Sequence, residues 1–361
     1  MTLSPETASP DAPTPPSAGF AEREGERIVV LREPASGSLA EVVPRLGSNV
    51  TRFRTLVEGR PIDVIGAPPD LATLRGLPTR YGAGVLFPYP GRVAGDGFDF
   101  QGRRVHLPPD PATNNAMHGL ARRRAWRVTD MGASPEAGAW VTTEIATREE
   151  AVTAAEWPFP FRLSLRATLR GGRLRSDVTV ANTGDVAMPF GLGFHPYIPT
   201  PLGPRGDADA CEVEIGATER WRDFIEPPAT VTPVAEDEWP RRPLPLADIA
   251  PVRRSAAGIV RNATFFRRGP DGGRGATGRL IDRANGVEAV VTCSPEFRAM
   301  VFYTPPGIAT ASLEPHTCIP NAFNLTGAGR PDPGLVVVAP GATWQGWYTL
   351  HAVPLRRPAV G

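Results

Sequence analysis

Four short segments, far apart along the chain, carry side chains that could move protons. They are, in chain order, LFPYPGRV with Arg92, NAMHGL with His118, GFHPYI with His195 and SLEPHTCIPNAFNL with Glu314. If the fold gathers them, a carboxylate and an imidazole can serve as general base and general acid while a guanidinium holds an oxygen. That set of groups suits a neutral, hydroxyl-rich substrate, so we expect sugar chemistry.

The four segments, in this order, resemble those of the aldose 1-epimerase (galactose mutarotase) family. The resemblance covers about residues 80 to 350 and includes MVFYTPP before Glu314 and PGATWQGWY after it. It implies an all-β fold, a large antiparallel β-sandwich (the galactose mutarotase-like supersandwich). It also implies an isomerase that interconverts the α and β anomers of a free aldohexose without a cofactor or a metal.

The resemblance also implies a role for each of the four side chains. Glu314 matches the general base that removes the proton of the C1 hydroxyl, and His195 matches the general acid that protonates the ring oxygen. The ring opens and recloses from the other face, and each proton transfer contributes about 10²–10⁴-fold to the rate. Arg92 and His118 match positions that hold sugar hydroxyls and steady charge on the reacting oxygens.

One position departs from the family pattern. An Asp that accepts hydrogen bonds from sugar hydroxyls usually precedes a short aromatic strand, and the segment NATFF has Asn262 in its place. Asn also donates and carries no charge, so the sugar preference could differ from galactose or glucose. Asp271 and Asp282 remain alternative positions for that contact.

Two alternatives stay open, and a metal site is not expected. Arg122, Arg123 and Arg124 directly follow HGLA, and because related mutarotases bind hexose phosphates through Arg, a hexose-6-phosphate mutarotase is one alternative. A noncatalytic sugar-binding protein is another, since the expected Asp is missing. His316 would share a strand face with Glu314, so a metal site is conceivable, but five His in 361 residues offer few ligands and we expect no metal.

Composition excludes several other classes of function. The 39 basic and 38 acidic residues leave a net charge of +1, so no global field attracts nucleic acid or an anionic membrane. Every basic residue is Arg, which excludes Schiff-base and P-loop lysine chemistry. We therefore expect a small-molecule sugar as the partner, with no nucleic acid and no membrane, and a monomer or homodimer.

Cysteine spacing and the N-terminal sequence bear on the compartment. The three cysteines, Cys211, Cys293 and Cys318, form no CxxC pair, which indicates neither a disulfide framework nor a zinc ribbon. The N-terminal segment lacks the basic and apolar regions of a signal peptide. These features favour a cytoplasmic location.

Strands joined by tight turns must position these side chains, because 38 Gly and 42 Pro interrupt helices repeatedly. Apolar and polar residues alternate over 161–170 and again over 173–181, so Gly171-Gly172 predicts a two-residue hairpin turn. That register pairs Leu165 with Val178, Leu163 with Val180 and Arg166 with Asp177. Asn285-Gly286 predicts a second hairpin with a type I′ turn.

The remaining chain divides into a tail and one domain. Residues 27–32, 298–303 and 335–339 predict further strands, and 222–258 predicts a long surface excursion. Residues 1–24 are rich in Pro, Ser, Thr and Ala, which predicts a disordered tail because they cannot offset the entropy of ordering. Residues 25–355 are expected to form a single mutarotase-like β-sandwich domain.

Overall fold

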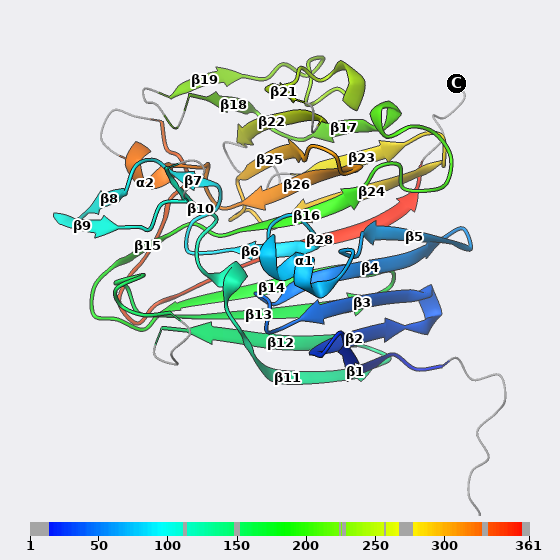
Figure 1. Cartoon of the computed structure of the whole chain (residues 1–361), viewed down its shortest axis with the longest axis horizontal. Helices are drawn as coiled ribbons and strands as arrows, with labels where there is room; N and C mark the ends of the chain where they lie inside the picture. The colour runs from blue at the N-terminus through cyan, green and yellow to red at the C-terminus, as the bar shows by residue number, and fades with distance from the viewer. Residues whose placement is uncertain are drawn as a thin grey trace, which may run out of the picture.

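The computed structural model describes residues 14–110, 114–147, 152–223, 225, 229–255, 258–266, 277–326 and 331–355. These residues form antiparallel strands, with two short α-helices, α1 (Leu71–Gly76) and α2 (Ala322–Leu325), and four 3-10 turns. The 3-10 turns are η1 (Pro34–Ser36), η2 (Ala121–Arg123), η3 (Ala208–Ala210) and η4 (Leu246–Asp248). The expected all-β, antiparallel architecture is confirmed (Figure 1).

The larger sheet has 13 strands, and the path β1-β2-β3-β4-β6-β16-β26-β25-β22-β18-β19 runs through it, with β5 on β4 and β21 on β22. Its strands are β1 (Ser17–Arg23), β2 (Glu26–Glu33), β3 (Ser38–Val43), β4 (Asn49–Val57), β5 (Arg60–Ile65), β6 (Ala83–Leu86), β16 (Gly193–Pro199), β18 (Glu219–Arg222), β19 (Thr230–Pro233), β21 (Arg253–Ser255), β22 (Gly258–Phe266), β25 (Ala299–Thr304) and β26 (Thr310–His316).

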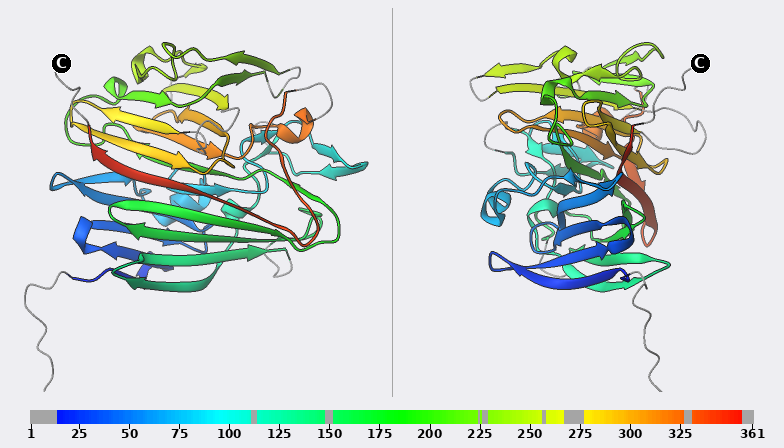
Figure 2. Two further views of the ribbon diagram at one scale, coloured as in Figure 1. Left: turned by 180° about the vertical axis from the view of Figure 1, so that it is seen from behind. Right: turned by 90° about the vertical axis from the view of Figure 1, so that its right-hand side faces the viewer.

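The second sheet has nine strands in the order β11-β12-β13-β14-β28-β24-β23-β17-β20 and packs behind the first (Figure 2). Its strands are β11 (Arg127–Ser134), β12 (Gly138–Ala146), β13 (Phe161–Arg170), β14 (Arg173–Asn182), β17 (Glu212–Ile215), β20 (Leu244–Pro245), β23 (Gly278–Asp282), β24 (Val287–Cys293) and β28 (Thr343–Pro354). Three small two-stranded sheets complete the fold: β7 (Arg92–Val93) with β10 (Ala116–Met117), β8 (Gly97–Phe100) with β9 (Arg103–His106), and β15 (Met188–Phe190) with β27 (Val336–Val338).

The apolar residues of both sheets face each other and form one large core cluster. On β26, Ala311 and Leu313 belong to this cluster, as do Phe194 of β16 and Phe302 of β25. Side chains alternate between the two faces of a strand, so the neighbouring residues of β16, β25 and β26 face away from the second sheet. That outward face carries the polar groups of the site.

Glu33 links the two sheets. Its carboxylate accepts hydrogen bonds from the backbone N–H groups of Gly171, at 2.6 Å, and Gly172, at 3.1 Å. Glu33 ends β2, whereas the two glycines form the turn between β13 and β14. The contact therefore fixes the end of one sheet against a turn of the other.

The hairpin at Gly171-Gly172 is confirmed in register. Leu165 pairs with Val178, Leu163 with Val180 and Arg166 with Asp177. Both turn glycines have positive φ, 56° and 68°, which is the signature of a type I′ turn.

The hairpin at Asn285-Gly286 is also present, but its predicted turn type is wrong. β23 and β24 pair up to Asp282 and Val287, which leaves a four-residue connection in which only Gly286, at 65°, has positive φ. The reason is the buried Asp282 carboxylate, which accepts hydrogen bonds from the backbone N–H and side-chain amide of Asn285. Those bonds hold Asn285 outside the left-handed region that a type I′ turn requires.

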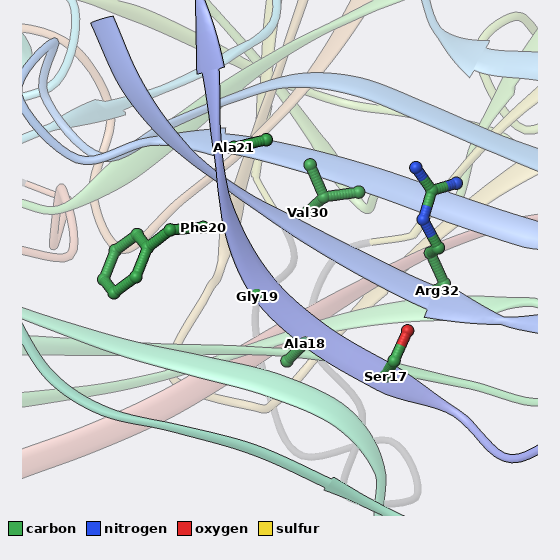
Figure 3. Close-up of a pocket in the computed structure, with 7 residues that line it drawn as sticks. All are labelled: Ser17, Ala18, Gly19, Phe20, Ala21, Val30 and Arg32. Carbon is green, nitrogen blue, oxygen red and sulfur yellow. The ribbon is translucent and has the colours of Figure 1, made fainter.

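The predicted disordered tail is wrong for residues 17–23, which form β1 and pair with β2 along its whole length. The Arg27 guanidinium lies 3.6 Å from the ring centroid of Phe20, and Ala18 packs on the core, so this segment has side-chain partners that its composition did not suggest. Residues 1–13 lie outside the described residues. Residues 17–21, Val30 and Arg32 line a pocket at the edge of the sheet formed by β1 and β2 (Figure 3).

The other expected strands are present. β2 contains residues 27–32, β25 coincides closely with 298–303, and β27 lies within 335–339. The expected surface excursion at 222–258 is more ordered than predicted in its described part, which includes β19, β20 and β21.

Candidate active site

Three neighbouring strands, β16, β26 and β25, carry the centre of the site on the face turned away from the core (Figure 1). β16 pairs with β26 so that Gly193 opposes His316 and Tyr197 opposes Ser312. The same register sets His195 opposite Glu314. Two residues from segments more than a hundred positions apart are thus brought together by strand pairing.

His195 and Glu314 are in direct contact. Nε2 of His195 lies 3.2 Å from Oε1 of Glu314, and the exposed fractions of the two residues are only 4% and 2%. The two residues expected to act as general acid and general base therefore lie side by side and are shielded from solvent.

Hydrogen bonds determine the tautomer of the neutral His195 imidazole, that is, which ring nitrogen is protonated. The Ser312 hydroxyl donates to the carbonyl oxygen of Pro196 at 2.9 Å, so at 3.0 Å it can only accept from Nδ1 of His195. Nδ1 is therefore protonated, and Nε2 is the nitrogen that can exchange a proton.

Nε2 of His195 faces acceptors. The Tyr197 hydroxyl donates to the carbonyl of Thr79 at 2.7 Å, so its oxygen, 3.4 Å from Nε2, can only accept there. With Oε1 of Glu314 on the same nitrogen, a single proton is shared between the imidazole and the carboxylate.

Burial acts on both members of the pair. It raises the pKa of Glu314 well above its usual value and lowers the pKa of His195 to about 3, because each charged form loses solvation. The shared proton can thus lie on Glu314, with both groups neutral, or on Nε2 of His195, as an ion pair. The pair has no net charge in either arrangement.

A second imidazole contacts the other carboxylate oxygen. Nε2 of His316 lies 3.2 Å from Oε2 of Glu314, and His316 is fully buried. Burial, and then the neighbouring His195, lower the pKa of His316 to about 3. Glu314 therefore lies between two imidazoles whose charged forms are disfavoured by burial.

Arg92 and His118 approach the centre from a separate pair of short strands. Arg92 of β7 pairs with Met117 of β10, and the backbone N–H of His118 donates to the backbone carbonyl of Gly91 at 2.7 Å. The His118 and His195 rings lie 5.6 Å apart between centroids, edge to face. The structure therefore brings His118 to the His195–Glu314 pair and ties Arg92 to the same loop.

Burial, and then the nearby charges, favour the neutral form of His118. Burial is the main cause of a pKa well below the usual value, followed by the charges of His195, Arg122, His316 and Arg92. The residue also has a φ of 59°, an uncommon backbone conformation for a side chain other than Gly. Arg92 itself is exposed, and its charge also acts on Tyr303, so it lies at the rim of the site.

Asn262 lies on the same sheet face as the centre but further out. It pairs with Tyr303 across β22 and β25, and the Tyr303 ring is 6.0 Å from the His195 ring between centroids. Asn262 is exposed, as a substrate ligand at the rim would be. Of the two alternatives to it, Asp282 belongs to the β23–β24 turn of the other sheet, and Asp271 lies outside the described residues.

The three consecutive arginines lie in different environments. Arg122 is buried and donates to the carbonyl of Met117 at 2.9 Å, whereas Arg124 forms an ion pair with Glu156. Arg123 is exposed. Their divergence weakens the case for a shared phosphate site.

The expected placement of His316 on the strand face of Glu314 is confirmed, whereas the roles of Ser312, Tyr197 and Tyr303 were missed by the sequence reasoning. A signal for Ser312 was available in the segment TASLEPH, where the same strand alternation sets it on the face of Glu314. The roles of Tyr197 and Tyr303 depend on which strands become neighbours, and the sequence did not reveal that order.

In the described part of the chain, no group of three or more His, Cys, Asp or Glu side chains could hold a metal ion. None of the helices described is long and apolar enough to cross a membrane.

Comparison with known proteins adds a family and a fold. A sequence model of the family described as Aldose 1-epimerase matches residues 29–351. A galactose mutarotase-like protein from Clostridium acetobutylicum has a similar structure, with a TM-score of 0.76 at 20% identity over 94% of this chain and 99% of that chain. The GalM/aldose epimerase homologue from C. elegans has a TM-score of 0.71 at 14% identity, over 94% and 100%. The expected galactose mutarotase-like fold is confirmed.

A curated relative is similar over a shorter stretch. The uncharacterized protein YihR of Escherichia coli K12 is 26% identical over 126 residues, which are 34% of this chain and 37% of that protein. The match thus spans little more than a third of the relative's length.

Proposed function

This chain belongs to the aldose 1-epimerase family, and we propose that it interconverts the α and β anomers of a free aldohexose by general acid and base catalysis. The contact of His195 Nε2 with Glu314 Oε1 is the observation that carries the proposal. The two groups share one proton, and the reaction requires one proton to be removed and one to be supplied.

Ring opening uses the ion-pair arrangement. The Glu314 carboxylate takes the proton of the C1 hydroxyl while His195 gives its Nε2 proton to the ring oxygen, so that C1 becomes an aldehyde and the bond from C1 to the ring oxygen breaks. Both groups are then neutral, which is the arrangement that burial favours. While the sugar is in its open-chain form, the pair is therefore in its neutral state, which loses less solvation on burial than the ion pair does.

Ring closure reverses each transfer. After rotation about the bond from C1 to C2, the C5 hydroxyl attacks the other face of the aldehyde and returns its proton to His195, while Glu314 protonates the new C1 oxygen. The ion pair is restored and no proton is exchanged overall. The direct contact within the pair lets the proton relocate when no sugar is bound.

Two further groups would hold the sugar in this mechanism. The neutral His118 imidazole and the Arg92 guanidinium can each donate a hydrogen bond to a hydroxyl or a nascent alkoxide. Asn262, on the same face, would contact a hydroxyl further from C1. The proposed ligand is a small neutral sugar, bound by a monomer or homodimer.

A polarimetric panel tests the proposal. Freshly dissolved α-D-glucose, α-D-galactose and glucose 6-phosphate are followed at a pH where spontaneous mutarotation is slow. We expect faster relaxation with at least one of the free sugars. Acceleration with the phosphate ester alone would support the hexose-6-phosphate alternative instead, and calorimetric binding of a free sugar without acceleration would support a binding protein.

A further inference from the structure

His316 has no role in the proton transfers proposed above, although it contacts the base. It is fully buried at the end of β26, and its Nε2 is 3.2 Å from Oε2 of Glu314, whereas His195 contacts Oε1. The two carboxylate oxygens therefore have different partners.

We propose that His316 is a positioning residue that donates its Nε2 proton to Oε2 of Glu314 and leaves Oε1 as the oxygen that takes the substrate's proton. This inference rests on the proposed function. It assigns a task to a side chain that itself touches no reacting atom.

The hydrogen-bond partners decide where the His316 proton lies. Nδ1 of His316 is buried, and no hydrogen-bond partner for it is found in the described part of the chain. A proton on Nδ1 would be an orphaned buried donor, and Nε2 would then turn its lone pair toward an oxygen of Glu314. A proton on Nε2 instead forms a hydrogen bond that becomes charge-assisted whenever Glu314 ionises.

The neighbouring strands hold the His316 ring in place. Gly193 of β16 and Ala299 of β25 are its partners on either side, and neither has a large side chain. A Cβ added at Gly193 would lie only 2.3 Å from Cδ2 of His316. The ring therefore occupies the space above Gly193, and this packing keeps Nε2 directed at Glu314.

Other charged or titratable groups face the same carboxylate, and a pH profile must be read with them in mind. His195 and Tyr197 face it from β16 and Tyr303 from β25, since the Glu314 charge acts on both phenols. His118, Arg92 and Arg122 approach from the covering loops. Comparison of variants that differ only at position 316 separates its effect from theirs.

The kinetic test compares His316→Leu, which cannot donate, with His316→Gln, whose amide can. We expect kcat to fall by about 10- to 100-fold in His316→Leu, the loss of one hydrogen bond to a charged group, with KM nearly unchanged. The acid limb of the kcat profile should move to higher pH, because the carboxylate loses a donor that favours ionisation. His316→Gln should recover most of the rate, and His106→Leu, at an exposed histidine, is the matched control.

A tautomer measurement tests the inference without relying on activity. Nitrogen-15 correlation spectra of the five histidines should show His316 neutral with its proton on Nε2, whereas the proton on Nδ1 would overturn the proposal. A folded His316→Leu protein with wild-type kcat and pH profile would also overturn it. If His316→Leu does not fold, the His316→Gln profile and the wild-type spectrum decide. Absence of anomerisation in the wild type would instead refute the proposed function, while the spectrum still reports on His316.

Discussion

At the scale of single residues, the proposed chemistry depends on which atoms of each side chain donate a proton and which accept one. The motifs identified His195 and Glu314 from the sequence, and the structure brings them within 3.2 Å. The surrounding acceptors could not be predicted in the same way. Ser312 is 117 residues from His195 in sequence, and only the strand register makes them partners.

Ser312 provides a prediction at this scale. Ser312→Ala removes the acceptor for Nδ1 of His195 and leaves a buried donor unsatisfied, a loss of about 1–3 kcal/mol. The imidazole can then turn or change tautomer, so we expect kcat to fall by about 5- to 100-fold in a polarimetric assay. Thr310→Ala is the control on the same strand, because the Thr310 hydroxyl has no hydrogen-bond partner among the described residues. An equal effect of both variants would contradict the role of Ser312.

At the scale of secondary-structure elements, strand alternation separates the core from the site. On β26 the buried Ala311 and Leu313 face the second sheet, and the alternate residues Ser312, Glu314 and His316 carry the polar groups of the site. This alternation and the glycine hairpin of β13 and β14 could be read from the sequence because both are local. The order of strands in the larger sheet could not, since β16 pairs with β6 and β26, which come from opposite ends of the chain.

Gly193 provides a prediction at this scale. In Gly193→Ala the new methyl group would overlap His316, whose Cδ2 lies 2.3 Å from the added Cβ. We expect the ring to be displaced from Glu314, with a loss of about 1–3 kcal/mol in the free energy of unfolding and a lower kcat. Denaturant titration and polarimetry measure the two effects. Gly19→Ala is the control, because nothing lies within 4 Å of a Cβ there, and a Gly193→Ala protein with wild-type stability and kcat would contradict the packing argument.

At the scale of the whole molecule, two sheets enclose one core, and several ionisable groups are buried on the outward face of one of them. The tail illustrates where composition misled the sequence analysis. Residues 17–23 look disordered by composition, yet they add β1 to the edge of the larger sheet because β2 offers a pairing partner. Edge pairing of this kind is a property of the assembled sheet.

The buried imidazoles predict a loss of stability in acid. The pKa of both His195 and His316 is lowered to about 3, while an unfolded histidine has a pKa of about 6.5. The unfolded state takes up protons as the pH falls below 6.5, so this stability is full above that value and is lost progressively toward pH 3. Glu314, whose pKa is raised, acts in the opposite direction and offsets one imidazole.

Denaturant titrations from pH 7.5 to 4.5 measure this dependence. For each net proton that is taken up on unfolding, the free energy of unfolding should fall by about 1.4 kcal/mol for every unit by which the pH is lowered. His316→Gln should have a slope smaller by about one proton. A wild-type stability that is flat over this range, or an unchanged slope in His316→Gln, would contradict burial of the neutral imidazoles.

The most direct measurement compares polarimetric relaxation of α-D-glucose and α-D-galactose with the wild-type protein and with Glu314→Gln. Gln is nearly isosteric with a protonated Glu and can keep contacts to His195 and His316, so the fold should be retained while the base is lost. The account predicts acceleration by the wild-type protein on at least one of these sugars and none by Glu314→Gln. A folded Glu314→Gln protein that still accelerates relaxation like the wild type would contradict the assignment of Glu314 as the base.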